Sequence, residues 1–150
     1  MLQPTSTQKQ KIAGAYTHSA LNNIGVLLLI AGLVVIEYNK IKSNGTHFYS
    51  LHGRLGLVTY CLFAFQALVG LTAFFTPKLY GSVANAKSLY KYHRMSGYLV
   101  LVLGFATVAA ATTTTFNKQT LHIQLWAVIV AALITLVGIV PRIKKAKFGF

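Results

Sequence analysis

The sequence predicts an all-α protein, an integral membrane bundle of four helices with up-down topology. Three observations predict it: 55% of the 150 residues are apolar, only 10% are charged, and the mean hydropathy is +0.58. An ordinary soluble domain carries roughly 25% charged residues. The apolar runs are continuous and lack the alternation of a membrane β-barrel, so helices are favoured. A chain of this length forms one domain, which we take as 1–150.

Charged residues divide the chain into four long apolar segments. These runs hold 25, 23, 23 and 23 uncharged residues, and they are bounded in order by Lys11 and Glu37, Arg54 and Lys78, Arg94 and Lys118, and Lys118 and Arg142. A bilayer core needs about 20 apolar residues per helix. The predicted helices therefore run near 18–38, 51–76, 91–114 and 120–141. The segment before them, MLQPTSTQKQK, is expected to be a short polar tail rather than a cleaved signal.

Lysine and arginine are divided unevenly between the two ends of such a bundle. One end carries ten of them: Lys9, Lys11, Lys78, Lys87, Lys91, Arg94, Arg142, Lys144, Lys145 and Lys147. The other end carries four: Lys40, Lys42, Arg54 and Lys118. Positive residues favour the cytoplasmic side, so both termini are expected in the cytoplasm. The glycosylation tripeptide Asn44-Gly45-Thr46 falls on the opposite side, which agrees with this orientation.

The net charge of +13 raises the question of nucleic acid as a partner. The basic residues punctuate apolar runs instead of forming a charged polar face, which argues against that partner. They set the topology, and the expected partner is membrane lipid. The sequence does not indicate which membrane holds the protein.

Each predicted helix begins with a histidine, and these four residues are the main functional signal. They are, in helix order, His18, His52, His93 and His122. Successive helices run in opposite directions, so His18 and His93 are expected at the cytoplasmic face, and His52 and His122 at the other face. Neutral imidazole is a good axial ligand of haem iron, and facing helices are a familiar place for such a site. We therefore expect two bis-histidine haem sites, one per leaflet.

One turn after each of these histidines, at i+4 and in the same order, stand Asn22, Gly56, Gly97 and Trp126. A glycine beside a ligand lets a flat macrocycle approach the helix backbone. A glycine in a membrane helix also permits close helix packing without any cofactor. The sequence leaves both explanations open.

Other kinds of site have too few residues to form. Cys61 is the only cysteine, so an intramolecular disulfide and a cysteine-only metal centre are excluded. Glu37 is the only carboxylate side chain, which excludes paired-carboxylate hydrolysis and di-iron chemistry. We expect Glu37 to pair with Lys40 at i+3.

Three segments of the chain resemble the cytochrome b561 family of transmembrane haem proteins. They are YTHSALNNIGVLLLIAGLVVIEYNK at 16–40, HFYSLHGRLGLVTYCLFAFQALVGLTAFFTP at 47–77, and YKYHRMSGYLVLVLGFATVAAAT at 90–112. The most specific element is Tyr49-Ser50-Leu51-His52 followed by Leu55-Gly56 and then Gln66, Gly70 and Phe75. Together the segments cover about two thirds of the chain.

The resemblance implies a b-type cytochrome that passes electrons across a membrane through two bis-histidine haems. In the family the electrons typically come from cytoplasmic ascorbate and reach monodehydroascorbate or a ferric chelate. By this resemblance His18 and His93 hold the cytoplasmic haem, and His52 supplies one ligand of the other. The family's remaining ligand lies on a helix before the one that matches 18–38.

Two explanations of the fourth ligand stay open. His122 could take the position from the far end of the chain, as in a circular permutation, which gives two haems. Alternatively the chain lacks an upstream ligand helix, and one complete haem site remains. The sequence also leaves open a haemless scaffold or degenerate family fragment.

Substrate contacts are expected at four basic residues. Arg54 follows His52 where the family usually has tryptophan, and it is placed to hold a haem propionate or an anionic acceptor. Lys11, Lys91 and Arg94 would supply positive charge for ascorbate or another small reductant on the cytoplasmic side. The sequence leaves open whether the protein is an enzyme, here an ascorbate-dependent reductase, and whether two copies form a homodimer.

Overall fold

A computed structural model gives the structure of the chain and describes residues 7–143. Within that range the fold is all-α, as the sequence predicts. Its elements are α1 (Gln8–Lys42), α2 (Leu51–Phe75), the 3₁₀ turn η1 (Pro77–Tyr80), α3 (Val83–Ser88), α4 (Tyr90–Ala111), the π-helical turn η2 (Asn117–Leu121), α5 (Leu125–Ile139) and the 3₁₀ turn η3 (Val140–Arg142).

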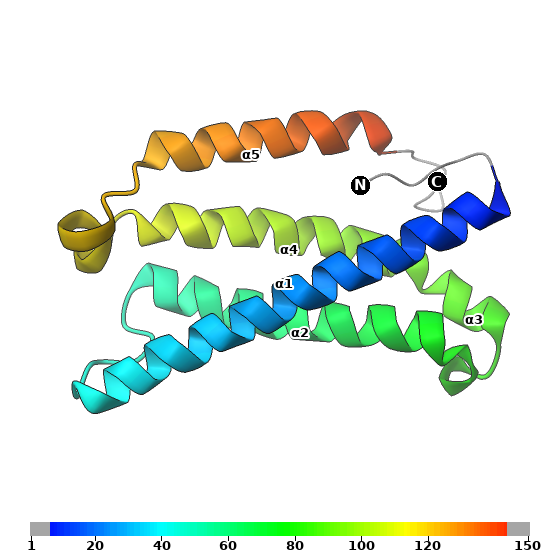
Figure 1. The fold of residues 1–150 in the computed structure, drawn as a ribbon, viewed down its shortest axis with the longest axis horizontal. Coiled ribbons are helices and arrows are strands. Elements are labelled where there is room, and N and C mark those ends of the chain that lie inside the picture. Colours follow the sequence, from blue (N-terminus) through cyan, green and yellow to red (C-terminus); the bar gives the residue numbers. More distant parts are fainter. Residues whose placement is uncertain (1–6, 144–150) are drawn as a thin grey trace.

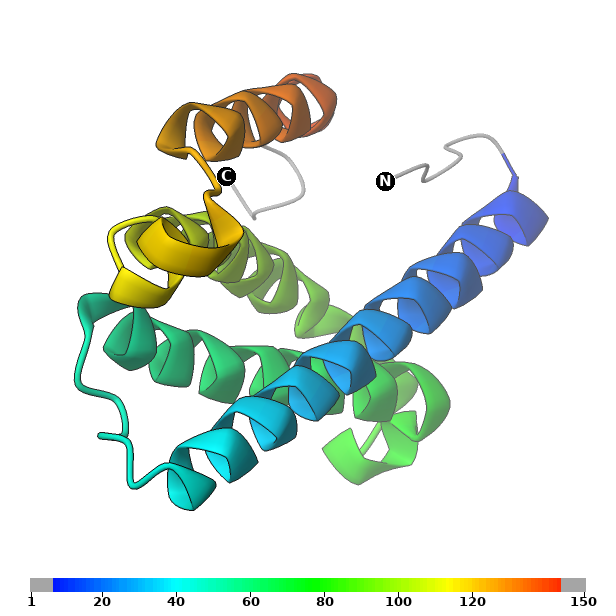
Figure 2. The same cartoon turned by 60° about the vertical axis from the view of Figure 1, so that its left-hand side comes forward.

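Helices α2 and α4 lie side by side, and the other two long helices are attached to this pair. Helix α1 crosses the pair obliquely, and α5 runs beside α4 (Figures 1 and 2). The start of α1, the short helix α3 and the end of α5 lie at one end of the molecule, and η2 lies at the other (Figure 1).

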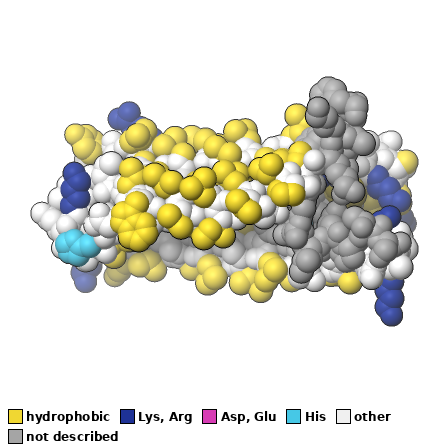
Figure 3. All heavy atoms as spheres, turned by 90° about the horizontal axis from the view of Figure 1, so that it is seen from above, with side chains coloured by type: hydrophobic (Ala, Val, Ile, Leu, Met, Phe, Trp, Pro, Cys, Tyr) yellow, Lys and Arg dark blue, Asp and Glu magenta, His cyan; other side chains and the backbone are white. Residues whose placement is uncertain are grey.

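Three stretches are long and apolar enough to cross a membrane: Gln8–Lys42, Leu51–Phe75 and Val83–Ala111. Their apolar side chains are largely exposed; Leu28 and Val35, for example, are each 69% exposed. Figure 3 shows hydrophobic side chains over the middle of one face, with Lys and Arg toward both ends. Such a surface suits lipid rather than water.

Helix α5 has 15 residues, which corresponds to about 22 Å of helix against a bilayer core of about 30 Å. It is apolar and shorter than the other three. A fourth membrane span at this position therefore stays a prediction. The sequence also places the start of this helix near residue 120, whereas α5 begins at Leu125 after the π-helical turn.

Helix α1 begins earlier than the apolar run that predicts it. The expected tail reaches Lys11, but the helix starts at Gln8, which corrects that expectation. The reason is a capping box: Thr7 accepts from the Gln10 backbone N–H, and the Gln10 side chain accepts from the Thr7 N–H, both at 3.2 Å. Residues 1–6 lie outside the described part of the chain.

The last turns of α1 hold the only acidic side chain of the sequence, Glu37. Glu37 bonds Nδ1 of His47, so the expected pairing with Lys40 is wrong. The Lys40 ammonium instead lies 6.0 Å from the ring centroid of Phe48. Glu37 pairs with His47, ten residues later, and not with Lys40, because the turn after α1 folds His47 back onto this helix. The spacing of residues along one helix does not predict a contact with a residue in the turn that follows it.

The α2–α4 interface follows a seven-residue spacing on both helices. Its members are His52, Thr59, Gln66 and Ala73 on α2, and His93, Val100 and Thr107 on α4. All except the two histidines are buried. A seven-residue repeat keeps one face of each helix turned toward its partner. This seam, as we call it, positions both histidines.

Candidate functional site

The structure brings His18 of α1 and His93 of α4 together, as the sequence predicts. Their ring centroids are 6.5 Å apart, and the ring planes are nearly perpendicular at 86°. Both side chains are half-buried. The two residues are 75 positions apart in the sequence, and the crossing of α1 over α4 is what joins them (Figure 1).

His18 is held by the residue one turn further along α1. The Asn22 side-chain amide lies 2.9 Å from His18 Nδ1 and donates to the His18 carbonyl oxygen at 2.7 Å. Pairs at i and i+4 lie on one face of a helix, so this contact is local. It restrains the rotation of the imidazole without help from another helix.

His93 is held from α2. Its ring packs against Gly70, where an added Cβ would lie only 2.9 Å from His93 Cε1. Gln66 Nε2 donates to the His93 carbonyl oxygen at 3.0 Å and to Ser96 Oγ at 2.9 Å. His93 Nδ1 is buried and has no hydrogen-bond partner. Such an orphaned nitrogen is unusual in a packed interior and indicates a site whose polar groups are completed by something else.

The spacing of this pair fits a haem. An imidazole nitrogen binds a transition metal such as zinc at about 2.0 Å, so two rings on opposite sides of one metal have centroids roughly 6 Å apart. The measured 6.5 Å agrees with that separation. Within residues 7–143 no group of three or more His, Cys, Asp or Glu side chains could hold a metal ion. The imidazoles of His18 and His93 are the two ligands that this part of the chain would offer to a haem.

His52 lies in the first turn of α2, toward the opposite end of the bundle. Its Nδ1 is 2.9 Å from the carbonyl oxygen of Thr107 on α4. A carbonyl oxygen only accepts, so Nδ1 carries the hydrogen and Nε2 of the neutral ring keeps its lone pair. Metal-bound histidines commonly make this second bond to a backbone carbonyl. His52 is thus chemically prepared to be a ligand.

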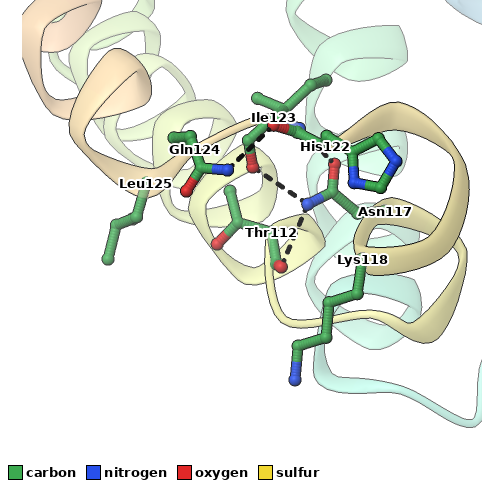
Figure 4. Close-up of a pocket in the computed structure, with 7 residues that line it drawn as sticks. All are labelled: Thr112, Asn117, Lys118, His122, Ile123, Gln124 and Leu125. Atoms are coloured by element: carbon green, nitrogen blue, oxygen red, sulfur yellow. Dashed lines mark hydrogen bonds between the residues drawn. The ribbon is translucent and has the colours of Figure 1, made fainter.

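His122 is placed differently from the sequence expectation. It stands before α5 rather than in the first turn of a helix, in a left-handed backbone conformation with φ 53°. Its exposed side chain lines a cavity of about 300 Å³ with Asn117, Lys118 and Gln124 among others (Figure 4). Among the described residues, no ring contact or hydrogen bond joins His122 to His52. The structure brings the first predicted pair together and leaves the second apart.

The backbone around His122 is fixed by a buried asparagine. Asn117 is 5% exposed, donates to the carbonyl oxygens of Thr112 and Ile123 at 3.1 and 2.9 Å, and accepts from the Ile123 N–H at 3.1 Å. The π-helical turn and this asparagine together delay the start of α5. Only a three-dimensional arrangement shows this, because Asn117 carries no helix-stop signal of its own.

The four basic candidates divide between the two ends of the bundle. Lys11 on α1 is exposed, whereas Lys91 and Arg94 on α4 are half-buried near His93. The Lys91 ammonium lies 4.8 Å from the ring centroid of Tyr92. Arg54, exposed in the first turn of α2, lies at the opposite end with His52.

Two of the glycines near the histidines serve helix packing. An added Cβ at Gly56 would meet Thr107 Cγ2 at 3.6 Å, and one at Gly97 would meet Gln66 Nε2 at 3.3 Å. The explanation by close helix contact therefore applies to both. Thr59 and Thr107 were not among the residues predicted from the sequence. The signal that could have found them is the seven-residue repeat, because Thr59 lies seven residues after His52 and Thr107 lies fourteen after His93.

The family described as eukaryotic cytochrome b561 has a model that matches residues 2–118. A rat protein named lysosomal membrane ascorbate-dependent ferrireductase CYB561A3 is 31% identical over 105 residues, which are 70% of this chain and 40% of that protein. A rice protein named probable ascorbate-specific transmembrane electron transporter 1 is 32% identical over 90 residues, 60% of this chain and 38% of its own.

An Arabidopsis thaliana protein named transmembrane ascorbate ferrireductase 2 is 32% identical over 120 residues, 80% of this chain and 50% of its own. The chain thus spans half or less of the length of these relatives. No solved structure matches it. Its membrane-length helices and these membrane relatives make it an integral, multi-pass membrane protein.

Proposed function

Because the chain belongs to the eukaryotic cytochrome b561 family, we propose that it passes single electrons across a membrane through histidine-bound haem b. The proposed reductant is ascorbate on the cytoplasmic side. The proposed acceptor on the other side is monodehydroascorbate or a ferric chelate, which would make the protein a transmembrane oxidoreductase. The names of the relatives support ascorbate as the reductant and a ferric acceptor. They include an ascorbate-dependent ferrireductase, a transmembrane ascorbate ferrireductase and a probable ascorbate-specific transmembrane electron transporter.

The observation that carries the proposal is the facing pair of His18 and His93. These side chains come from two helices, lie at a separation that suits one iron between them, and leave a buried nitrogen without a partner. Family membership implies haem b as the cofactor. When bound, the haem supplies the one-electron chemistry, and the protein supplies ligands, orientation and a water-poor surrounding.

The chain's own residues have distinct parts in this proposal. Asn22 restrains the His18 ring, and Gln66 with Gly70 fixes the position of His93. A neutral imidazole must keep one ring nitrogen unprotonated to bind metal, so the partner of the other nitrogen matters. His93 Nδ1 has no partner among the described residues and would be satisfied by a group that enters with the cofactor.

The reductant would be held by positive charge near the His18–His93 end. Lys11, Lys91 and Arg94 are the residues we assign to this role, since ascorbate is an anion at neutral pH. Arg94 follows His93 directly in the sequence, so its positive charge and the proposed haem ligand lie on the same turn of α4. At the other end Arg54 is our candidate for holding an anionic acceptor or a haem propionate.

The second haem site is a separate part of the proposal. His52 is one ligand, and its partner is either His122 or a histidine on a helix that precedes this sequence. The first alternative requires the turn 117–124 to move His122 toward His52. The second requires no movement and yields one complete site from this chain alone.

The test is to purify the chain, quantify haem per chain, and record reduced-minus-oxidised spectra. We expect a low-spin b-type signal, and its absence would contradict the proposal. Replacing His93 by Ala should remove the haem that it would hold with His18, because one of the two ligands would be lost. One haem per chain in the unmodified protein would favour the upstream ligand over His122.

A matched control is His47→Ala. His47 is also a histidine near a helix end, but it lies in the α1–α2 turn and bonds Glu37. We expect it to leave the haem spectrum and the haem content unchanged. Equal losses in both variants would indicate general unfolding rather than loss of a ligand.

A haemless scaffold is the second candidate function. The observation that favours it is the α2–α4 seam, in which Gly56 and Gly97 pack against the other helix with no cofactor involved. This function predicts a colourless protein whose stability is indifferent to His18 and His93. The same spectra and variants distinguish the two functions.

A further inference from the structure

Three residues on one face of α2 meet a single residue of α4, Thr107. His52 Nδ1 donates to the Thr107 carbonyl oxygen at 2.9 Å. Gly56 leaves room for the Thr107 methyl group, with 3.6 Å between that methyl and an added Cβ. The Thr59 and Thr107 hydroxyl oxygens are 3.0 Å apart. Thr59 and Thr107 are 5% and 8% exposed, so these contacts form away from solvent.

The two hydroxyl groups connect the helices in one register. Each also lies 2.7 Å from a carbonyl oxygen four residues earlier in its own helix, Leu55 for Thr59 and Leu103 for Thr107. A hydroxyl carries a single hydrogen, so the cross-helix bond forms when one of the two threonines donates to the other hydroxyl instead of to its own helix. The cross-helix bond holds the Thr107 carbonyl beside His52.

This arrangement decides which nitrogen of His52 carries the hydrogen. With Nδ1 donating to a carbonyl, Nε2 is the unprotonated nitrogen and is available to a metal. If the Thr107 carbonyl moved away, both forms of the ring would become populated. The hydrogen bond therefore selects the ligand-competent form before any cofactor arrives.

We propose that Thr107 is a positioning residue for His52, and that its contacts with Gly56 and Thr59 hold His52 in the Nδ1–H form that exposes Nε2 to iron. The role as an iron ligand rests on the proposed function. The selection of the ring form does not, because it follows from the α2–α4 packing alone. The two claims can therefore fail separately.

The first measurement is the imidazole ¹⁵N spectrum of haem-free protein, with His52 assigned by comparison with His52→Ala. We expect one form, protonated at Nδ1. A His52 ring protonated at Nε2, or an even mixture, would overturn the proposal. The result does not depend on whether the protein later binds haem.

The second measurement compares Thr107→Val with Thr107→Ser. Valine keeps the shape and the backbone carbonyl but removes the hydroxyl, so the ratio of the Nδ1–H to the Nε2–H form of His52 should fall by about threefold, the equivalent of an average interhelical hydrogen bond in a membrane protein. Serine retains the hydroxyl and should restore the ratio. An unchanged ratio in Thr107→Val would overturn the proposal.

Thr135→Val is the matched control. Thr135 of α5 makes the same bond within its helix, to the Ala131 carbonyl at 2.8 Å, and its hydroxyl makes no cross-helix bond within residues 7–143. We expect no change in the His52 ring form. An equal change in this variant would mean that any lost threonine hydroxyl has the effect, which would refute a specific role for Thr107.

The third measurement uses haem-loaded protein. Thr107→Val should shift the midpoint potential of the signal that His52→Ala removes and leave the His18–His93 signal in place. The latter serves as an internal control. A shift of both signals together would contradict positioning of His52 by Thr107. Absence of any haem, with the Nδ1–H form intact, would refute the proposed function and leave the positioning role standing.

Discussion

Gly70 of α2 is the residue against which the His93 ring packs. Replacing it by Ala would place a Cβ 2.9 Å from His93 Cε1, too close for the present ring position. The backbone can stay where it is, because the imidazole is the movable end of a side chain. We expect haem affinity at the His18–His93 site to fall by about 10- to 100-fold, the usual effect of losing a group that orients a metal ligand. Haem titration followed by absorbance measures it.

Gly104→Ala is the control for this prediction. Gly104 also lies in a long helix, and an added Cβ there has nothing within 4 Å. The substitution should leave haem affinity unchanged and favour the helix slightly, since alanine is the better helix former by up to about 1 kcal/mol. A similar loss of haem in both variants would show that the Gly70–His93 contact is not the cause.

The placement of His18 and His93 at one end could be predicted from the sequence. Both residues stand at the start of a predicted helix, and the first and third helices of an up-down bundle run in the same direction. The helix start predicted near His122 differs from the structure for a physical reason. Its position after Lys118 in an apolar gap resembles a helix start, yet Asn117 folds the turn and puts His122 at φ 53°. Side-chain bonds of a buried asparagine to distant backbone groups are not encoded by spacing. The contacts of Thr107 with His52 and Thr59 could not be predicted from the sequence either, because they depend on which face of α4 meets α2.

At the scale of the element, Gln66 is the main polar link between α2 and α4 at the end that holds His93. Replacing it by Leu preserves volume and removes the bonds to the His93 carbonyl and to Ser96 Oγ. We expect a loss of about 0.6 to 1.7 kcal/mol in the free energy of unfolding, the range for interhelical hydrogen bonds in membranes. Unfolding by sodium dodecyl sulfate in mixed micelles provides the measurement.

Phe65→Leu is the neighbouring control, because Phe65 is 64% exposed on the same helix and faces away from the seam. It should change the unfolding free energy little. If Gln66→Leu were as stable as this control, the two hydrogen bonds of Gln66 would make no net contribution to the free energy of unfolding.

The long helices could be predicted from charge gaps, but their ends could not. Helix α1 extends to Gln8 because Thr7 and Gln10 cap it, although its first turns are polar. At its other end α4 stops in a run of threonines whose hydroxyls bond the last carbonyls: Thr112 to Ala109, Thr113 to Ala110 and Thr114 to Ala111. Helix ends depend on such local bonds, whereas the spans depend on hydropathy.

At the scale of the whole molecule, the excess of Lys and Arg at one end predicts its orientation. Single cysteines at Lys78 and at Lys118, each exposed and at opposite ends, can test it in a Cys61→Ser background (Figure 1). In sealed vesicles with the cytoplasmic face outward, a membrane-impermeant maleimide should label Lys78→Cys and spare Lys118→Cys. Detergent should then expose both. Labelling of Lys118→Cys but not of Lys78→Cys before detergent is added would show the opposite orientation.

Helix α1 has 35 residues and none of them is buried. It touches its neighbours through a few side chains: Tyr16 against Phe74 and Phe75, the Tyr60 hydroxyl on the Leu29 carbonyl, and His18 beside His93. An iron bound by both imidazoles would join α1 to α4, two helices that otherwise make few contacts. Under the proposed function, insertion of haem would then be an assembly step, and the docking of α1 on α2 and α4 would depend on it.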